Sequence, residues 1–312
     1  MIETSGSANW RDRLAVALPW LTLAWIGVML ASLYWGFLNR FVIGSWHGAW
    51  GLDFFSVPRA WENLLAGESI YDTAASQFGP RPTATWYPYH PVLAVVVGSW
   101  TRQLPPAWSY LTFVAFSLAL LAFSGWLLAR LAKDRLTGRI MFASLFFGPA
   151  IYLMLFIGQM HIFTVLAMAL IFAGIWQLQS EDGPACRRAE WLIAAGLLAA
   201  FFSKPVVALF LPTLLLVRET RRATLASLGV YLVVSLVFLY VPALNARGLN
   251  FIHWANILTI SQSTKMMAHL GHIFELPMSE NPEIFSLPTW VDHLVGGHVN
   301  PQVFRLPVLF VV

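Results

Sequence analysis

Long apolar stretches without charged residues divide the chain and predict membrane-spanning helices. A helix needs about 20 residues to cross a bilayer. Five stretches are close to or above that length: 14–38, 107–129, 140–157, 160–178 and 223–244. A further apolar stretch, 91–100, has only ten residues, so we expect it to be re-entrant or interfacial. The pattern predicts an all-α polytopic membrane protein.

The apolar stretch 191–217 is long enough to span but carries Lys204 at its midpoint. A single span would place this lysine at mid-bilayer, at a cost of about 2.5–3.5 kcal/mol. Proline is well tolerated at the first position of a helix, and Pro205 follows the lysine directly. We therefore expect a hairpin of two short helices with Lys204 at its apex.

Basic residues gather at the ends of the apolar stretches and predict the orientation of the chain. Short loops rich in Lys and Arg stay in the cytoplasm. The basic groups are Arg11 with Arg13; Arg130, Lys133, Arg135 and Arg139; Arg187 with Arg188; and Arg218, Arg221 and Arg222. With all of them inside, 39–106 and 245–305 become large extracytoplasmic loops of a single domain over 1–312. Lys204 and the segment 158–161 then lie on that same outer side.

Composition agrees with a membrane protein, because 58% of the residues are hydrophobic and only 11% are charged. The net charge of +4 could suggest nucleic acid, but the basic residues lie at the ends of apolar stretches rather than on one face, so we expect no nucleic-acid partner. The single cysteine, Cys186, excludes an intrachain disulfide. No metal-binding motif occurs, so we predict no metal site and no cofactor, with divalent metal use left open.

Both ends of the sequence carry an expectation. The stretch 14–38 is too long for the apolar region of a cleavable signal peptide, so we expect it to be retained. Residues 306–312 look like the beginning of another span, so we expect the protein to continue beyond residue 312.

The first outer loop contains a helical pattern that begins near Asp53. Apolar residues recur at helical spacing opposite polar ones: Phe54, Val57, Trp61, Leu64 and Leu65 against Arg59, Glu62 and Asn63. This predicts an amphipathic helix lying along the membrane interface, with Asp53 as its N-cap and Gly67 as its C-terminal cap. Capping alone would explain Asp53. A carboxylate there can also act as a general base that takes a proton from a sugar hydroxyl. Arg59 is a candidate substrate contact.

Other candidate binding residues lie on the same predicted side of the membrane. Lys204 is a candidate to bind a lipid phosphate. Gln159 and His161 open a span, where free N–H groups favour an anion or sugar oxygens, although ordinary capping would also explain them. The aromatic stretch 86–91 predicts a rigid turn, and its Tyr87 and His90 could form a wall for a sugar or polyprenyl chain.

The second outer loop supplies a further set of polar residues. The segment 254–274 has a helical pattern that places Gln262, Lys265 and His269 on one stripe, from which they could meet a donor phosphate. Ordinary solvated loop residues are the alternative for each of them. Glu275 is the second choice for the catalytic carboxylate if Asp53 is only a cap.

Several short motifs together resemble glycosyltransferase family 87, formerly a domain of unknown function. They are D-F at Asp53, A-W-x-x-L-L-A-G-x-x-x-Y-D ending at Asp72, Y-P-Y-H-P at 87–91, G-Q at 158–159 and S-K-P at 203–205. The resemblance implies a GT-C fold with an acidic first extracytoplasmic loop and a polyprenyl-phosphate sugar donor. It also implies a mannosyltransferase of a bacterial plasma membrane, in which Asp53 and Lys204 match the loop carboxylate and the K-P position of the family.

The sequence thus predicts a membrane glycosyltransferase that moves a hexose, with mannose as first choice, from a polyprenyl-phosphate donor to a glycolipid or glycan acceptor. Phosphate leaves readily once its charge is neutralised, so positioning and one base are sufficient, with inversion at the sugar. The alternatives are a non-catalytic lipid or sugar transporter and an inactive scaffold of an envelope-assembly complex. Transporters usually bind at mid-membrane between repeats, and no repeat is visible in the sequence.

Overall fold

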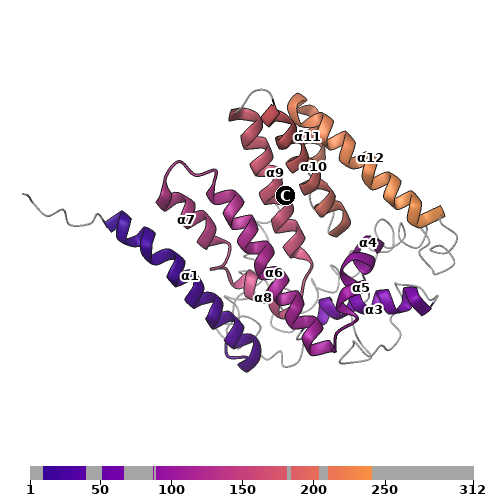
Figure 1. The fold of residues 1–312 in the computed structure, drawn as a ribbon, viewed down its shortest axis with the longest axis horizontal. Coiled ribbons are helices and arrows are strands. Elements are labelled where there is room, and N and C mark those ends of the chain that lie inside the picture. The colour runs from indigo at the N-terminus through magenta and orange to yellow at the C-terminus, as the bar shows by residue number, and fades with distance from the viewer. Residues whose placement is uncertain are drawn as a thin grey trace, which may run out of the picture. The chain divides into compact units, whose positions relative to one another are not determined.

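The computed structural model describes residues 10–39, 51–66, 87, 89–180, 184–203 and 210–240, and every regular element among them is a helix (Figure 1). In chain order these are α1 (Trp10–Trp35), α3 (Leu52–Ala66), α4 (Pro91–Leu93), the π-helical turn η1 (Ala94–Gly98), α5 (Ser99–Thr101), α6 (Pro106–Ala129), α7 (Arg135–Ser144), α8 (Pro149–Ile157), α9 (His161–Ser180), α10 (Pro184–Ser203), α11 (Leu211–Leu216) and α12 (Arg218–Tyr240).

The chain divides into two compact units. One comprises Met1–Met29 with Trp50–Phe251, and the other Leu30–Ala49 with Ile252–Val312. The second is described only over 30–39, where the Ser32 carbonyl accepts the Gly36 N–H (2.7 Å) and the Ser32 hydroxyl accepts the Leu38 N–H (2.8 Å). These bonds end α1. The elements described below, from α3 onward, belong to the first unit.

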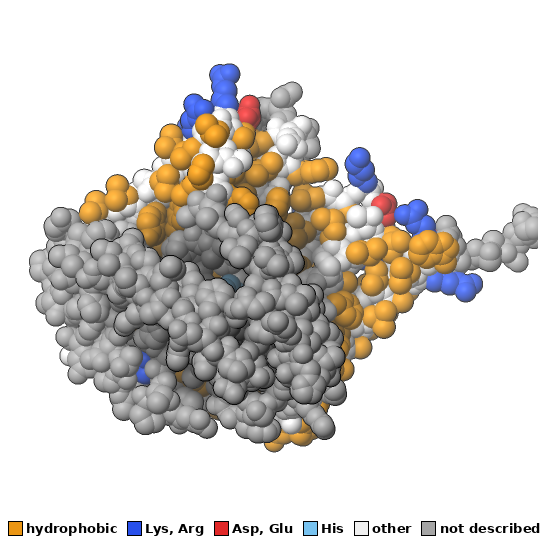
Figure 2. Space-filling model, turned by 180° about the vertical axis from the view of Figure 1, so that it is seen from behind, with side chains coloured by type: hydrophobic (Ala, Val, Ile, Leu, Met, Phe, Trp, Pro, Cys, Tyr) orange, Lys and Arg blue, Asp and Glu red, His pale blue; other side chains and the backbone are white. Residues whose placement is uncertain are grey.

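Four of the described helices are long and apolar enough to cross a membrane: Trp10–Trp35, Pro106–Ala129, His161–Gln179 and Arg218–Phe238. Many large apolar side chains of the described helices are exposed, and in the view of Figure 2 they cover much of the described surface, with Lys and Arg in a few small groups. The prediction of an all-α polytopic membrane protein is confirmed. The segment Pro91–Thr101 is helical but too short to span, in agreement with the expectation for 91–100.

The predicted span 140–157 is present as two helices and not as one. It is broken into α7 and α8, which meet at an angle of 43° and would together form a fifth span. The break covers residues 145–148, between Ser144 at the end of α7 and Pro149 at the start of α8. Pro149 has no N–H with which to continue the hydrogen-bond pattern of a preceding helix. The Trp25 indole N–H of α1 donates to the Phe146 carbonyl at 2.8 Å. The Phe146 carbonyl at the break is therefore hydrogen-bonded by a side chain of another helix.

The predicted hairpin over 191–217 is partly confirmed. Helix α10 ends at Ser203, directly before Lys204, as expected, and residues 204–209 lie outside the described part. The first arm is not short, however, because α10 has 20 residues and begins at Pro184. The helix extends through the basic residues at its start because Pro184 occupies a first-turn position, where its missing N–H is not needed. The second arm, α11, has six residues.

Helices α9 and α10 pack closely because glycines face the contact. A Cβ on Gly174 would lie 2.6 Å from Ile193 Cγ1, and one on Gly196 would lie 2.7 Å from the Ala167 carbonyl oxygen. Small residues allow such close approach between membrane helices. Helix α6 packs against α9, and α12 packs against α10. The connection at 181–183 is short, so α9 and α10 run antiparallel (Figure 1).

The predicted helix after Asp53 is present as α3. The expectation that its polar face is exposed is wrong. Arg59 is only 2% exposed and Asn63 only 7%, while Phe54 and Val57 are fully buried. Helix α3 packs against η1, α5, α6 and α8, so residues on both its faces are buried, although Leu65 in its last turn is 51% exposed. A Cβ on Gly98 would lie 2.8 Å from the Val57 carbonyl oxygen, which shows how closely η1 approaches. Gly67 lies outside the described residues.

Candidate functional site

Asp53 lies in the first turn of α3 and is partly buried. The helix begins two residues earlier than the N-cap prediction for Asp53 requires. The Gly51 carbonyl accepts the Phe55 N–H (2.9 Å), which makes Gly51 the residue that starts the helix, with a left-handed φ of 64°. The N-cap prediction is therefore wrong. A carboxylate in a first turn still interacts favourably with the positive end of the helix dipole.

The start of α3 is attached to the end of α8. The Gly51 N–H donates to the Phe156 carbonyl at 2.8 Å. The Tyr110 hydroxyl of α6 donates to the Leu155 carbonyl at 2.6 Å and lies 3.2 Å from the Phe156 carbonyl oxygen. The last carbonyls of a helix have no partner within it, so these bonds satisfy groups that would otherwise be orphaned. They also hold the first turn of α3 in place.

The turn that follows α8 lies directly on the first turn of α3. Gly158 closes α8 in the left-handed conformation, with φ 75°. A Cβ at this position would lie 2.4 Å from Phe54 Cβ. Next in the turn, Gln159 Oε1 accepts a hydrogen bond from His161 Nδ1 at 2.7 Å. The structure thus brings the predicted Gln159 and His161 to the helix turn that carries Asp53.

The stretch 87–91 contains one tyrosine that supports the turn and one that faces the site. The Tyr87 hydroxyl donates to the His90 carbonyl (2.7 Å) and accepts the Ala94 N–H (2.8 Å), so it holds the backbone. Tyr89 is 2% exposed. Burial, and then the negative charge of Asp53, raise the pKa of Tyr89 well above its usual range, and the Met160 backbone hydrogen-bonds to its hydroxyl. Sequence reasoning chose Tyr87 and missed Tyr89, for which the pattern carries no signal.

His90 links the site to the ends of α10 and α12. Its Nδ1 accepts the Val92 N–H (3.2 Å), so the ring proton is on Nε2, which donates to the Ser235 hydroxyl (3.2 Å). The ring centroid lies 5.0 Å from that of Phe202 and 5.5 Å from that of Tyr231. Burial lowers the pKa of His90 to about 3, so the imidazole is neutral. Both ring nitrogens hold protein partners.

The site lies at one end of the helices and the basic residues at the other. In the second turns of α10 and α12, Glu190 pairs with Arg222 (3.9 Å). Farther along, Phe201 in the last turn of α10 packs on Tyr231 near the middle of α12, with ring centroids 5.3 Å apart. The two helices are therefore parallel. The site residues lie near the ends of α10 and α12 and the start of α9. Arg187, Arg188, Arg218, Arg221 and Arg222 lie at the starts of α10 and α12.

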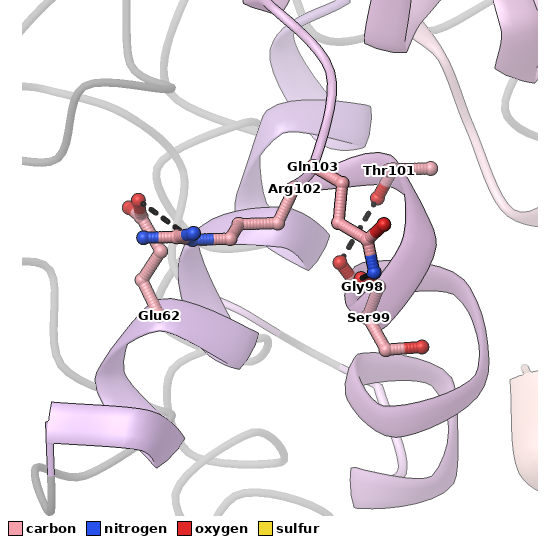
Figure 3. A network of polar contacts seen from close by, with 6 residues as sticks. All are labelled: Glu62, Gly98, Ser99, Thr101, Arg102 and Gln103. Atoms are coloured by element: carbon pink, nitrogen blue, oxygen red, sulfur yellow. Dashed lines mark hydrogen bonds and ion pairs between the residues drawn. The ribbon is translucent and has the colours of Figure 1, made fainter.

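A second contact fastens α3 to the 91–101 segment, farther from Asp53. Figure 3 shows Arg102 reaching Glu62, with 3.5 Å between Nε and Oε1. Beside it, the Thr101 hydroxyl donates to the Val97 carbonyl at 2.7 Å. The ion pair is partly exposed, so its contribution to stability is small, about 0–1 kcal/mol. The ion pair links the C-terminal part of α3, at Glu62, to the residue that follows α5.

Comparison with known proteins identifies the family. A model of glycosyltransferase family 87 matches residues 87–311. The chain belongs to glycosyltransferase family 87. It is therefore a sugar-transferring enzyme, and its apolar helices make it an integral membrane protein. No curated protein and no solved structure matches the chain.

The family 87 match covers Tyr89, His90, Gln159 and His161 and begins after Asp53. Membership in the family therefore does not by itself assign a role to Asp53. The structure connects Asp53 to the matched part through the contacts of α3 with α8 and the Gly158 turn. Arg59 lies on α3, six residues beyond Asp53 and buried.

The remaining candidates of this family 87 chain lie outside the described residues: Lys204, Gln262, Lys265, His269 and Glu275. Their proposed roles stay predictions, as does the loop assignment of 245–305. Within the described part of the chain, no group of three or more His, Cys, Asp or Glu residues is placed to hold a metal ion.

Proposed function

We propose that this glycosyltransferase moves a hexose, with mannose as first choice, from a polyprenyl-phosphate donor to a hydroxyl group of a glycolipid or glycan acceptor. Asp53 is the general base. The observation that carries this proposal is the position of Asp53. Its helix turn is held against the Gly158 turn by the Gly51–Phe156 hydrogen bond (2.8 Å), next to Gln159, His161 and the buried Tyr89.

In the proposed reaction the acceptor hydroxyl gives its proton to an Asp53 oxygen while its own oxygen forms a bond to the anomeric carbon. The bond from that carbon to the phosphate oxygen breaks, and polyprenyl phosphate leaves with the electron pair. Attack opposite the leaving group inverts the centre, so a β-linked donor yields an α-linked product. A carboxylate within hydrogen-bond reach of the attacking hydroxyl is sufficient as base.

Other residues have supporting roles in this proposal. Gln159 and His161 stand at the start of α9, where the helix dipole and free N–H groups favour phosphate or sugar oxygens. Lys204, Lys265 and His269 supply positive charge to the donor phosphate, and Gln262 binds beside them. Neutralising phosphate charge stabilises the leaving group, so no covalent nucleophile is needed. No cofactor takes part.

The distribution of charge supports an extracytoplasmic site in a plasma membrane. Basic residues occupy the helix ends opposite the site. Since such residues favour the cytoplasmic side, the end that carries Asp53 faces outward. Polyprenyl-phosphate sugars are membrane lipids, so a site at the membrane boundary can take the donor laterally. The GT-C fold implied by the resemblance, with its acidic first outer loop, agrees with this placement.

The proposal is tested with Asp53→Asn in the purified full chain, reconstituted in lipid with radiolabelled polyprenyl-phosphate mannose and a panel of glycolipid acceptors. Asparagine keeps the shape of the side chain but cannot accept the proton, so we expect transfer to fall by 100-fold or more. Glu62→Gln is the matched control, since it removes a carboxylate from the other end of α3. It should retain activity.

Transfer by Asp53→Asn at the wild-type rate would exclude Asp53 as the base and turn attention to Glu275. Equal losses in Asp53→Asn and Glu62→Gln would mean that the effect is on folding of α3. A nucleotide sugar that replaces the lipid-linked donor would contradict the proposed donor class.

A further inference from the structure

Tyr110 of α6 lies against the first turn of α3, close to residues on both sides of Asp53 in the sequence. Its ring centroid lies 6.0 Å from that of Phe54 and 6.2 Å from that of Phe55. On the other side of Asp53, a Cβ added to Gly51 would lie 2.9 Å from Tyr110 Cδ2. The Tyr110 side chain is fully buried. One aromatic ring of α6 therefore packs on the turn that carries the proposed base.

The hydroxyl of Tyr110 restrains the carbonyl to which α3 is attached. It donates to the Leu155 carbonyl at 2.6 Å and lies 3.2 Å from the Phe156 carbonyl oxygen. The same Phe156 oxygen accepts the Gly51 N–H at 2.8 Å. The last carbonyls of a helix have no partner inside it, so their position depends on bonds of this kind. One side chain of α6 thus holds the end of α8 and, through the Phe156 carbonyl, the start of α3.

Both of these carbonyls keep a backbone donor when the hydroxyl is removed. The Leu155 oxygen also accepts the Gly158 N–H at 3.2 Å, and the Phe156 oxygen accepts the Gly51 N–H. A variant without the hydroxyl therefore leaves neither oxygen orphaned, and we expect it to fold. What such a variant loses is the hydrogen-bonded link from α6 to the end of α8.

We propose that Tyr110 is a positioning residue for Asp53, which holds the first turn of α3 where the carboxylate can meet the acceptor hydroxyl. This inference rests on the proposed role of Asp53 as the base, and it adds a residue of another helix to the reaction. A base acts only within hydrogen-bond reach of the proton that it takes. Tyr110 is buried and has no proposed contact with a substrate. It should therefore affect the transfer step and not the binding of donor or acceptor.

The test is Tyr110→Phe in the full chain, reconstituted in lipid with radiolabelled polyprenyl-phosphate mannose and a glycolipid acceptor. Phenylalanine keeps the ring contacts with α3 and removes the hydroxyl. A misplacement of about 1 Å can cost on the order of 100-fold, so a shift of a fraction of this distance should lower kcat by about 10-fold. The KM values for donor and acceptor should stay at those of the wild type.

Ser124→Ala is the matched control on the same helix. Ser124 is fully buried, and its hydroxyl donates to the Leu120 carbonyl at 2.8 Å. It lies 14 residues beyond Tyr110, or about 21 Å along α6. The control therefore removes a buried hydroxyl-to-carbonyl bond of α6 far from the start of α3. Its kcat should equal that of the wild type.

A double-mutant cycle separates positioning of Asp53 from a general effect on folding. In the Asp53→Asn protein no base is left to position, so adding Tyr110→Phe should change the residual kcat by less than about 2-fold. The fall in Tm that Tyr110→Phe causes should be the same in both backgrounds, because the same hydrogen bond is lost. As a rescue, 4-aminophenylalanine at position 110 keeps an N–H donor at the same place and should restore kcat.

A wild-type kcat in Tyr110→Phe would overturn the inference. An equal fold-loss in the wild-type and Asp53→Asn backgrounds, in Ser124→Ala, or in the 4-aminophenylalanine protein would also overturn it. A fully active Asp53→Asn protein would instead remove the proposed base, a result that needs no variant of Tyr110. If Asp53→Asn is inactive while Tyr110→Phe is fully active, the base stands and only the role of Tyr110 fails.

Discussion

Gly158→Ala tests the contact on which the site depends. Gly158 has φ 75°, a left-handed conformation that costs an alanine roughly 1 to 2 kcal/mol. The new Cβ would also lie 2.4 Å from Phe54 Cβ, far inside normal contact distance. Neither Cβ can rotate away, so the first turn of α3 has to move, which costs about 1 to 3 kcal/mol more. Together these give a destabilisation of about 2 to 5 kcal/mol.

The measurement combines thermal unfolding with transferase activity of the purified chain in lipid. At roughly 2 to 4 °C per kcal/mol we expect the Tm to fall by roughly 4 to 20 °C. Since Asp53 adjoins Phe54, displacement of this turn should also lower kcat, and a shift of about 1 Å can cost on the order of 100-fold.

Gly148→Ala is the matched control for Gly158→Ala. This glycine flanks the other end of α8, has φ −93°, and would have no atom within 4 Å of a new Cβ. Its Tm and kcat should stay close to wild type. A Gly158→Ala protein with wild-type Tm and kcat would refute the close packing of the Gly158 turn on α3.

Two further predictions concern the supports of the fold. Trp25→Phe removes the indole N–H that donates to the Phe146 carbonyl (2.8 Å) at the break between α7 and α8. The free energy of unfolding should therefore fall by about 1 to 3 kcal/mol. Trp20→Phe, at an exposed position, is the control and should leave this free energy unchanged. A Trp25→Phe Tm equal to that of the control would contradict the role of this bond. Burial lowers the pKa of His90 to about 3 in the folded protein, against about 6.5 in the unfolded chain. Between about pH 3 and pH 6.5 the unfolded chain therefore binds a proton that the folded protein does not. The free energy of unfolding falls as pH falls below about 6.5. Acidification from pH 7 to pH 5 should therefore lower the free energy of unfolding by about 2 kcal/mol through His90. The Tm of His90→Gln should fall less than that of the wild type over this interval. Equal falls in both proteins would argue against a buried neutral His90.

Local features of the fold could be predicted because they depend on neighbouring residues alone. The apolar lengths predicted the helices that became α1, α6, α9 and α12, and the lysine at 204 predicted the end of α10 at Ser203. The break between Ser144 and Pro149 was missed, although the Gly-Pro pair in a charge-free stretch was a signal for it. Helical spacing also predicted α3 correctly.

Burial on α3 could not be predicted in the same way. Helical spacing separates two faces of a helix, but whether the polar face meets water depends on what packs against it. Arg59 and Asn63 are buried, while the 91–101 segment meets α3 on the other side, at Val57 and Trp61. Contacts with several elements that are distant in sequence therefore bury residues on both faces of α3. For the same reason the sequence pattern could not distinguish Tyr87 from Tyr89 as the tyrosine of the site. Neither residue belongs to a helix, so no period assigns it to a face.

The sequence by itself determined the class of the protein, the approximate positions of its main spanning helices and the separation of basic ends from the end that carries Asp53. Apolar length and charge act locally and are readable along the chain. Only the tertiary structure decided which residues meet. Asp53 and the Gly158 turn are about a hundred residues apart in sequence and touch because two glycines let backbone approach backbone at the ends of α3 and α8. Such contacts depend on the packing of whole helices, and a local pattern does not encode it.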